Sequence, residues 1–345
     1  MTYTHLPNSD LKVSKLCLGT MTWGNQNTQN EGFAQMDFAL DKGINFFDTA
    51  ELYPVPAEEQ TYAETERIIG NWFQKTKSRD KVVLASKIAG TGDYTAHIRT
   101  KGFGKETLED AVNQSLKRLK TDYIDLYQLH WPERHSNYFG VRDFKADPDE
   151  QWDDNFNEIL HALDGIIKSG KIRHIGISNE KAWGTMRYLE ESKTHDLPKI
   201  ATIQNPYSLL NRTFEGDLAE VSYRENIGLL AYSPLACGVL SGKYINGTDS
   251  KNSRLNLFSR FSRYSSANCS DATKRYMEIA KAHGLNVTQM ALAFVTQQPF
   301  VTSNIIGATS VEQLSENIES IHLQLNDDLI KAIDAVHDSQ PNPAT

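Results

Sequence analysis

The chain has 345 residues and a formal net charge of −8 at pH 7, because 44 acidic residues outnumber 36 lysines and arginines. This balance argues against nucleic acid or an anionic membrane surface as a partner. The three cysteines form no CxxC pair and the N-terminus lacks an apolar signal segment, so we expect a soluble, cytoplasmic protein. Residues 284–311 carry no charge, but their asparagines and glutamines are too polar for a membrane span. We expect a buried helix, a turn and a strand there.

Short apolar runs alternate with stretches of helical period along the chain. The runs that predict strands lie at residues 16–18, 45–48, 82–87, 123–128, 172–177, 202–204, 228–232 and 304–307. This alternation, without a large change in composition, predicts one α/β domain over residues 1–345, a closed (β/α)8 barrel. A doubly wound open sheet is the rival fold, but residues 19–24 (GTMTWG) lack the G-x-G-x-x-G that it needs after its first strand.

Three long segments predict loops on one face of the barrel. They are residues 89–104, rich in glycine and threonine, residues 131–155, which mix aromatic and acidic side chains, and residues 244–268, which carry arginines. Because the loops that follow barrel strands form the catalytic face, we expect these segments to select the substrate. Aromatic residues in and near them suggest an apolar or aromatic substrate, although such residues equally often anchor loops; they are Trp23, Trp131, Tyr138, Phe258 and Phe261.

Ionisable residues stand at the ends of consecutive predicted strands. Asp48 ends the second strand, Lys87 ends the third and His130 follows the fourth, while Tyr53 lies on the loop after Asp48. In a barrel these side chains would meet at one mouth, where Asp48 and Lys87 would form an ion pair. A nearby ammonium lowers the pKa of a tyrosine and makes it a better proton donor, and a histidine can hold a carbonyl oxygen. The set predicts protonation of a carbonyl oxygen while a nucleophile, such as hydride, attacks the carbon.

Two other chemistries remain open for this region. Lys87 could be the Schiff-base nucleophile of a barrel aldolase, but Asp48 and Tyr53 would keep it protonated. His130, Glu133 and His135 could hold a metal ion, although one flexible loop that contains a proline seldom provides the open tripod of ligands that is needed. We therefore predict no metal site.

These residues also resemble the motifs of the aldo-keto reductase family. The resemblance is carried by Asp48-x4-Tyr53, by Lys87 in Ala-Ser-Lys, by His130 in Gln-Leu-His and by the run GINFFDTA at residues 43–50. It spans nearly the whole chain, and runs such as QNPYSLLNR, which begins at Gln204, resemble the bacterial Tas-type reductases and, more distantly, the potassium-channel β subunits. It implies a (β/α)8 TIM barrel with an N-terminal β-hairpin cap and long βα loops on the catalytic face.

The resemblance implies a role for each of the four residues at the mouth. Tyr53 would be the general acid, Lys87 and Asp48 would tune it, and His130 would orient the carbonyl group of the substrate. The activity implied is the NADPH-dependent reduction of aldehydes or ketones to alcohols by hydride transfer, with a small carbonyl compound as the only expected partner. A slow NADPH-binding redox sensor, like a channel β subunit, is the alternative. The physiological substrate and the oligomeric state cannot be predicted from the sequence.

The resemblance also implies where NADPH would bind. The family's cofactor contacts correspond here to Thr20, Met21, Gln26, Asp48, Ser178, Asn179, Gln204, Tyr232, Ser233, Pro234, Leu235, Ala236, Cys237, Lys243, Arg254, Gly307, Thr309, Gln313, Glu316 and Asn317. Ser178, Asn179 and Gln204 would hold the nicotinamide carboxamide, and Tyr232 would stack on its ring.

The remaining contacts divide between the phosphates and the adenosine. The small residues that follow Tyr232 would bring backbone N–H groups to the diphosphate, with Lys243 adding a charge, while Cys237 would fill space rather than act as a redox switch. The residues from Gly307 onward would hold the adenosine end. Arg254 would bind the 2′-phosphate, with Arg260 as the alternative.

Overall fold

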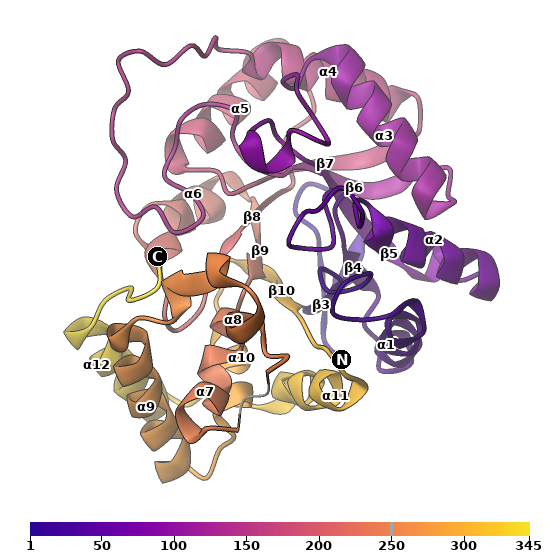
Figure 1. The fold of residues 1–345 in the computed structure, drawn as a ribbon. Helices are drawn as coiled ribbons and strands as arrows, with labels where there is room; N and C mark the ends of the chain where they lie inside the picture. Colours follow the sequence, from indigo (N-terminus) through magenta and orange to yellow (C-terminus); the bar gives the residue numbers. More distant parts are fainter. Residues whose placement is uncertain (249–250) are drawn as a thin grey trace.

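The computed structural model describes residues 1–248 and 251–345 (Figure 1). Eight parallel strands close into a barrel in the order β10-β3-β4-β5-β6-β7-β8-β9. They are β3 Leu16–Gly19, β4 Phe46–Asp48, β5 Val83–Ile88, β6 Ile124–Leu129, β7 Ile172–Ser178, β8 Thr202–Pro206, β9 Gly228–Tyr232 and β10 Val301–Ile306. The predicted TIM barrel is therefore confirmed.

Helices separate consecutive strands and surround the barrel (Figure 1). They are α1 Gln29–Asp41, α2 Glu64–Thr76, α3 Lys105–Leu119, α4 Phe156–Lys168, α5 Ala182–His195, α6 Leu218–Glu225, α7 Lys243–Asn246, α8 Arg254–Leu257, α9 Ala267–Ala282, α10 Val287–Thr296, α11 Val311–Glu319 and α12 Asp327–Ser339. Local sequence fixes several of their starts: α1 begins with a reciprocal capping box between Thr28 and Glu31, and the side chain of Ser310 caps α11.

Strand limits depart from the predicted ones where a tertiary contact decides them. Asn45 lies outside β4, because its side chain accepts from the Ser14 amide at 2.8 Å and donates to the Lys12 carbonyl at 2.8 Å. β10 starts at Val301, three residues before the predicted start, and pairs with β9 across a shift in register. The uncharged stretch forms α10, a turn and β10, as predicted. Within the part of the chain that the structure describes, no helix has the length and apolar character to cross a membrane.

A hairpin precedes the barrel, as the family resemblance implied. Its strands are β1 Tyr3–His5 and β2 Lys12–Ser14, which pair antiparallel. Leu6, Leu11 and Val13 of this segment pack in one apolar cluster with side chains from the barrel strands, namely Cys17, Phe46, Ala85, Leu126, Ala201, Leu230 and Ile305. Phe46, Ala85 and Leu126 lie two positions before Asp48, Lys87 and Gln128, toward the amino ends of their strands, so the hairpin closes the amino end of the barrel.

The next layer of inward-facing side chains is polar. Side chains alternate along a strand, so the residues two positions after that apolar layer also face the interior. In β4, β5 and β6 these residues are Asp48, Lys87 and Gln128, and all three are buried. The barrel thus places polar groups directly above its apolar floor, at the carboxyl ends of the strands where active sites of this fold lie.

Candidate active site

Three of the four predicted mouth residues are joined by hydrogen bonds. The Lys87 ammonium nitrogen Nζ donates to Asp48 Oδ2 at 2.7 Å and to the Tyr53 hydroxyl at 3.4 Å, and it also donates to the Thr49 carbonyl at 2.7 Å. Neighbouring strands explain the meeting, since Asp48 pairs with Ala85 in the register of β4 and β5, two residues before Lys87. The expected Asp48–Lys87 ion pair is present, and the phenol lies within reach of the amine.

His130 completes the group at the end of β6. Its ring lies edge-on to Tyr53, with the ring centroids 5.8 Å apart, and its backbone N–H donates to the Ile88 carbonyl. The side chain is buried, and Nδ1 has no hydrogen-bond partner among residues 1–248 and 251–345. Burial, reinforced by the charge of Lys87, holds the pKa of His130 well below its usual value. The imidazole is therefore neutral at pH 7.

The pKa of Tyr53 differs from the predicted direction. Burial raises this pKa above its ordinary value of 10.0, and the opposing charge of Lys87 does not overcome that effect. The predicted net lowering by Lys87 is wrong because it considered the neighbouring charge without the loss of water around the phenol. Tyr53 is consequently a protonated phenol at neutral pH, in the state from which it can donate.

Lys87 is an ammonium ion rather than a free amine. Burial alone would lower its pKa, but the charge of Asp48 and the hydrogen bonds to Asp48 and Tyr53 outweigh burial and raise the pKa above its usual value. A Schiff-base nucleophile needs the unprotonated amine at working pH. The aldolase chemistry left open for Lys87 is therefore disfavoured by its surroundings.

Two buried amides satisfy the second oxygen of Asp48. Gln204 Nε2 donates to Asp48 Oδ1 at 2.8 Å, and Gln128 Nε2 donates to the same oxygen at 3.3 Å. Gln204 Nε2 also donates to Gln128 Oε1 at 3.3 Å. Gln128 is a site residue that sequence reasoning did not single out. The signal was available, because Leu126 and Gln128 share the inward face of β6.

The residues predicted to hold the nicotinamide carboxamide lie beside this network. Asn179 Nδ2 donates to the His130 carbonyl at 2.9 Å, and Ser178 Oγ donates to the Gln204 carbonyl at 2.8 Å. The Tyr232 hydroxyl, from the end of β9, donates to Asn179 Oδ1 at 2.7 Å. The structure therefore brings all four of these candidates to the same mouth as Asp48 and His130.

The predicted phosphate loop has an unusual backbone. Ser233, Ala236, Cys237 and Gly238 all have positive φ, between 48° and 89°. These conformations form tight turns, in which the N–H groups of Ala236 and Gly238 donate to the carbonyls of Ser233 and Leu235 at 2.8 Å each. Lys243 lies against Gly238, where an added Cβ would come within 2.9 Å of its Nζ. Burial raises the pKa of Cys237, so it is a protonated thiol, in keeping with the space-filling role predicted for it.

Arg254 lies close to the first βα loop. Its guanidinium donates to Gln26 Oε1 at 2.9 Å and approaches Met21 Sδ at 3.9 Å. Thr20, next to Met21, donates to the Asp48 carbonyl at 2.9 Å. The predicted cofactor contacts Asp48, Thr20, Met21, Gln26 and Arg254 therefore lie next to one another. The alternative arginine, Arg260, is exposed and stacks on Tyr94 instead, with its guanidinium carbon 3.9 Å from the ring centroid.

The predicted adenosine residues gather between β10 and α11. Thr309 donates through its backbone N–H and its hydroxyl to Gln313 Oε1, at 3.0 and 3.1 Å, and Asn317 Nδ2 donates to the Gly307 carbonyl at 3.2 Å. Glu316 and Gln313 are exposed near the start of α11. Asn27, the neighbour of Gln26, donates to the Thr309 carbonyl at 2.9 Å and so connects this end to the row at Arg254.

Two buried ion pairs that sequence reasoning missed anchor the long loops. Arg134, four residues after His130, pairs through two hydrogen bonds with Glu180, which follows Asn179. Arg99, in the loop after β5, donates to Glu51 Oε1 at 2.7 Å, close to Tyr53 in sequence. Buried charges of opposite sign that are far apart in the chain cannot be paired from sequence alone.

The metal site considered for the loop after β6 is not assembled. Glu133, the central residue of that set, uses one carboxylate oxygen to accept from the Phe103 amide at 2.6 Å and the other to accept from Asn155 at 2.8 Å. Across the residues that the structure describes, no three histidine, cysteine, aspartate or glutamate side chains group in a way that could bind a metal ion.

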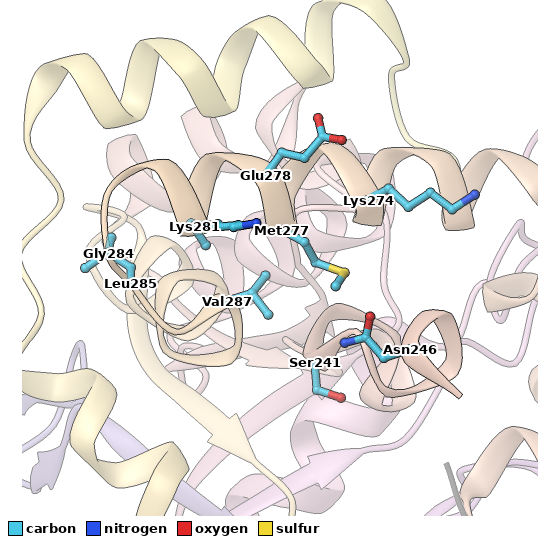
Figure 2. A pocket seen from close by; sticks show the side chains of 10 residues that line it. Ser241, Asn246, Lys274, Met277, Glu278, Lys281, Gly284, Leu285 and Val287 are labelled. Atoms are coloured by element: carbon cyan, nitrogen blue, oxygen red, sulfur yellow. The ribbon is translucent and has the colours of Figure 1, made fainter. Parts of the chain in front are cut away.

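A cavity of about 570 Å³ lies beside α7, α9 and α10 (Figure 2). Met277, Lys281 and Val287 line it from α9 and α10, and Ser241 and Asn246 line it from the outer side of the phosphate loop and α7. None of the four mouth residues, Asp48, Tyr53, Lys87 and His130, lines it. It is a surface depression beside the candidate cofactor region and not part of the mouth formed around Asp48, Tyr53, Lys87 and His130.

Comparison with known proteins agrees with this arrangement. The sequence model of the Aldo/keto reductase family matches residues 15–338. Protein tas of Escherichia coli (strain K12) is 48% identical over 351 residues, covering 100% of both chains. The uncharacterized oxidoreductase YrpG of Bacillus subtilis (strain 168) is 33% identical over 97% of this chain and 96% of its own. Norsolorinic acid reductase B of Aspergillus parasiticus is 27% identical over 97% of this chain and 84% of its own. The chain therefore belongs to the aldo/keto reductase family, as an oxidoreductase of the Tas type.

Proposed function

We propose that this protein reduces aldehydes or ketones to alcohols with NADPH, and that Tyr53 is the proton donor. The observation that carries the proposal is the position of the Lys87 ammonium within hydrogen-bond distance of both Asp48 and Tyr53. The fully buried ammonium has three N–H groups, of which Asp48 and the Thr49 carbonyl accept two at 2.7 Å each, so the third is directed at the phenol. This contact would let Lys87 stabilise the phenolate of Tyr53 after proton transfer.

The residues present fit NADPH in chemistry as well as in position. Gln204 is buried, and its Oε1 accepts no hydrogen bond from residues 1–248 and 251–345, so it can receive the N–H of a carboxamide. Arg254 is half-buried and forms no ion pair with an acidic side chain in the same described ranges, which suits a phosphate. Tyr232 would lie under the nicotinamide ring, and residues 233–243 would cover the diphosphate. NADPH would supply the hydride.

The chain's own side chains would handle the proton and the carbonyl. Tyr53 would donate its phenolic proton to the carbonyl oxygen, and the Lys87 ammonium would stabilise the phenolate that remains. His130, neutral at pH 7, would donate an N–H to the same oxygen without carrying a charge that competes with Lys87. Asp48 would hold Lys87 in place.

The surroundings of Tyr53 favour an apolar or aromatic carbonyl compound. Trp131 belongs to the apolar cluster that contains Tyr53, and Tyr138 and Phe261 pack against that cluster from two different loops. A substrate approaching the phenol would therefore meet aromatic surface, which binds apolar groups well. The three cysteines are unpaired, which supports the prediction of a reducing compartment, the cytoplasm.

A panel of aldehydes and ketones, assayed with NADPH and separately with NADH, tests the proposal. We expect carbonyl-dependent loss of NADPH absorbance, and we expect Tyr53→Phe to abolish it while the dissociation constant of NADPH changes little. Turnover retained in Tyr53→Phe would refute the role of the tyrosine. Tight NADPH binding with slow cofactor release and negligible turnover on every substrate would instead favour the redox-sensing alternative.

A further inference from the structure

Gln128 is a buried glutamine at the centre of the mouth, and it belongs neither to the four predicted mouth residues nor to the predicted cofactor contacts. It lies on β6, two residues before His130, and is fully buried. In the barrel register it pairs with Lys87 on one side and with Gly176 on the other. A buried primary amide is costly unless its donors and acceptors are used, so its partners are informative about why it is there.

The partners of Gln128 fix the direction of two amides. Asp48 is a carboxylate and can only accept, so the ends of Gln128 and Gln204 that contact it must both be the donating Nε2 ends. Gln128 Oε1 is therefore the end that faces Gln204, and it accepts the second N–H of Gln204 Nε2 at 3.3 Å. Both N–H groups of Gln204 are thereby used inside the barrel, and its Oε1 is left as the free end.

Reversing the Gln204 amide would be unfavourable at both contacts. It would bring Gln204 Oε1 against both the Asp48 carboxylate and Gln128 Oε1, and it would leave these two amide oxygens without donors in a buried site. A primary amide has nearly the same shape in its two flipped orientations, so only the contacts with Asp48 and Gln128 determine which orientation Gln204 adopts. With Asp48 alone the amide could pivot about a single contact, whereas Gln128 provides a second point of attachment.

The barrel also keeps space for the Gln128 side chain. A Cβ added at Gly176, its neighbour on β7, would lie 3.2 Å from Gln128 Cγ and 2.4 Å from Thr202 Oγ1. A larger residue at that position would clash first with Thr202 and would also press on the Gln128 side chain. The network is thus supported from the strand on its other side.

We propose that Gln128 is a positioning residue, which fixes Gln204 with its carbonyl oxygen toward the cofactor and makes the site select a nicotinamide that carries an amide N–H. The inference rests on the proposed function, since it concerns how the protein would recognise NADP(H). Gln128 acts through Gln204 and does not itself contact the ligand. Its effect should therefore depend on whether the ligand has an N–H to donate.

The test compares two dinucleotides by equilibrium binding, without turnover. NADP+ has the carboxamide N–H2, whereas its 3-acetylpyridine analogue has a methyl group in that place and is otherwise the same. Dissociation constants are measured by calorimetry for the unsubstituted protein, for Gln128→Met, and for Gln128→Asn, which keeps a buried amide but is too short to reach Gln204. We expect each variant to bind NADP+ about three- to tenfold more weakly, the effect of losing one neutral hydrogen bond. Binding of the analogue should change less than twofold.

A matched control and the contrary outcomes are available in the same chain. Gln298, half-buried just before β10 and hence at the opposite end of the barrel, donates to the Phe294 carbonyl, so Gln298→Met should leave both dissociation constants unchanged. Equal weakening of both dinucleotides in the Gln128 variants would overturn the proposal, and so would equal binding of the two by the unsubstituted protein. Absence of any dinucleotide binding would refute the proposed function itself.

Discussion

His130 is buried as a neutral imidazole, and this has a consequence for stability. Its pKa in the folded protein lies well below its usual value of 6.5, so the unfolded chain binds a proton more readily than the folded one. As pH falls below about 6.5, the free energy of unfolding should therefore decrease, by at most about 1.4 kcal/mol per pH unit for one such group. Urea unfolding at pH 7.5 and pH 5.5 measures the decrease. His130→Gln should show a smaller decrease over that interval, and an equal one would show that His130 does not contribute.

Arg254 is predicted to read the phosphate that distinguishes NADPH from NADH. Its guanidinium is held by Gln26 and is half-buried, so a phosphate contact there would be a charge-assisted one. Arg254→Gln should weaken NADPH binding about ten- to a hundredfold, while the dissociation constant of NADH should hardly change. Arg260→Gln, at the exposed neighbour, serves as the control. Equal losses for both dinucleotides would place Arg254 on the diphosphate instead.

At the scale of single residues, the sequence predicts which side chains lie close together, but it does not predict their protonation states. Asp48, Lys87 and His130 could be placed together because each stands at the end of a neighbouring strand, a relation set by short-range patterns. The pKa of Tyr53 could not be predicted, since it depends on how much water the folded loops remove from the phenol. Gln128 could have been identified from the alternation in β6, but its contact with Gln204 needs the barrel.

At the scale of the element, the first turn of α5 packs closely against the Arg134–Glu180 ion pair. A Cβ added at Gly184, in the first turn of this helix, would lie 2.5 Å from Arg134 Nη2 and 2.5 Å from Glu180 Oε1. Gly184→Ala should separate the pair and destabilise the protein by about 1–3 kcal/mol in urea unfolding, the usual cost of overpacking. It should also weaken NADP+ binding, because Glu180 follows Asn179 directly.

A second helix provides the matched control for Gly184. Gly165 lies in α4, and a Cβ added there would meet no atom within 4 Å. Gly165→Ala should be neutral or stabilise the protein by up to about 1 kcal/mol, because alanine favours a helix over glycine. Similar destabilisation by the two substitutions would mean that helix context, and not the ion pair, determines the effect at Gly184.

Elements were predictable in kind and order because hydrophobic periodicity is local. The ends of the elements were less predictable. Contacts with the N-terminal hairpin keep Asn45 out of β4, and pairing with β9 sets the start of β10. The loops after β5 and β6 could be located but not described, because buried pairs such as Arg99–Glu51 join residues that no short-range pattern relates.

At the scale of the whole molecule, the hairpin and the mouth occupy opposite ends of one barrel. Leu6 is fully buried against the apolar floor. Leu6→Ala should lower the free energy of unfolding by about 2–5 kcal/mol, as other large-to-small core substitutions do, yet leave the dissociation constant of NADP+ unchanged. Val141→Ala, at a side chain that is 56% exposed, should change stability by less than about 0.5 kcal/mol. A weaker NADP+ affinity in Leu6→Ala would show that the two ends are coupled.

Leu6, Leu11 and Val13 cover the amino end of the barrel, and strand side chains of the same cluster fill its interior. Since nothing can pass through this packed interior, Lys87 and Tyr53 can be approached only from the side of the βα loops. Under the proposed function, the dinucleotide and the carbonyl compound would therefore share one entrance. The ligand whose reacting group lies deeper would have to bind first and leave last, so the packing of the barrel would set the order of binding and release.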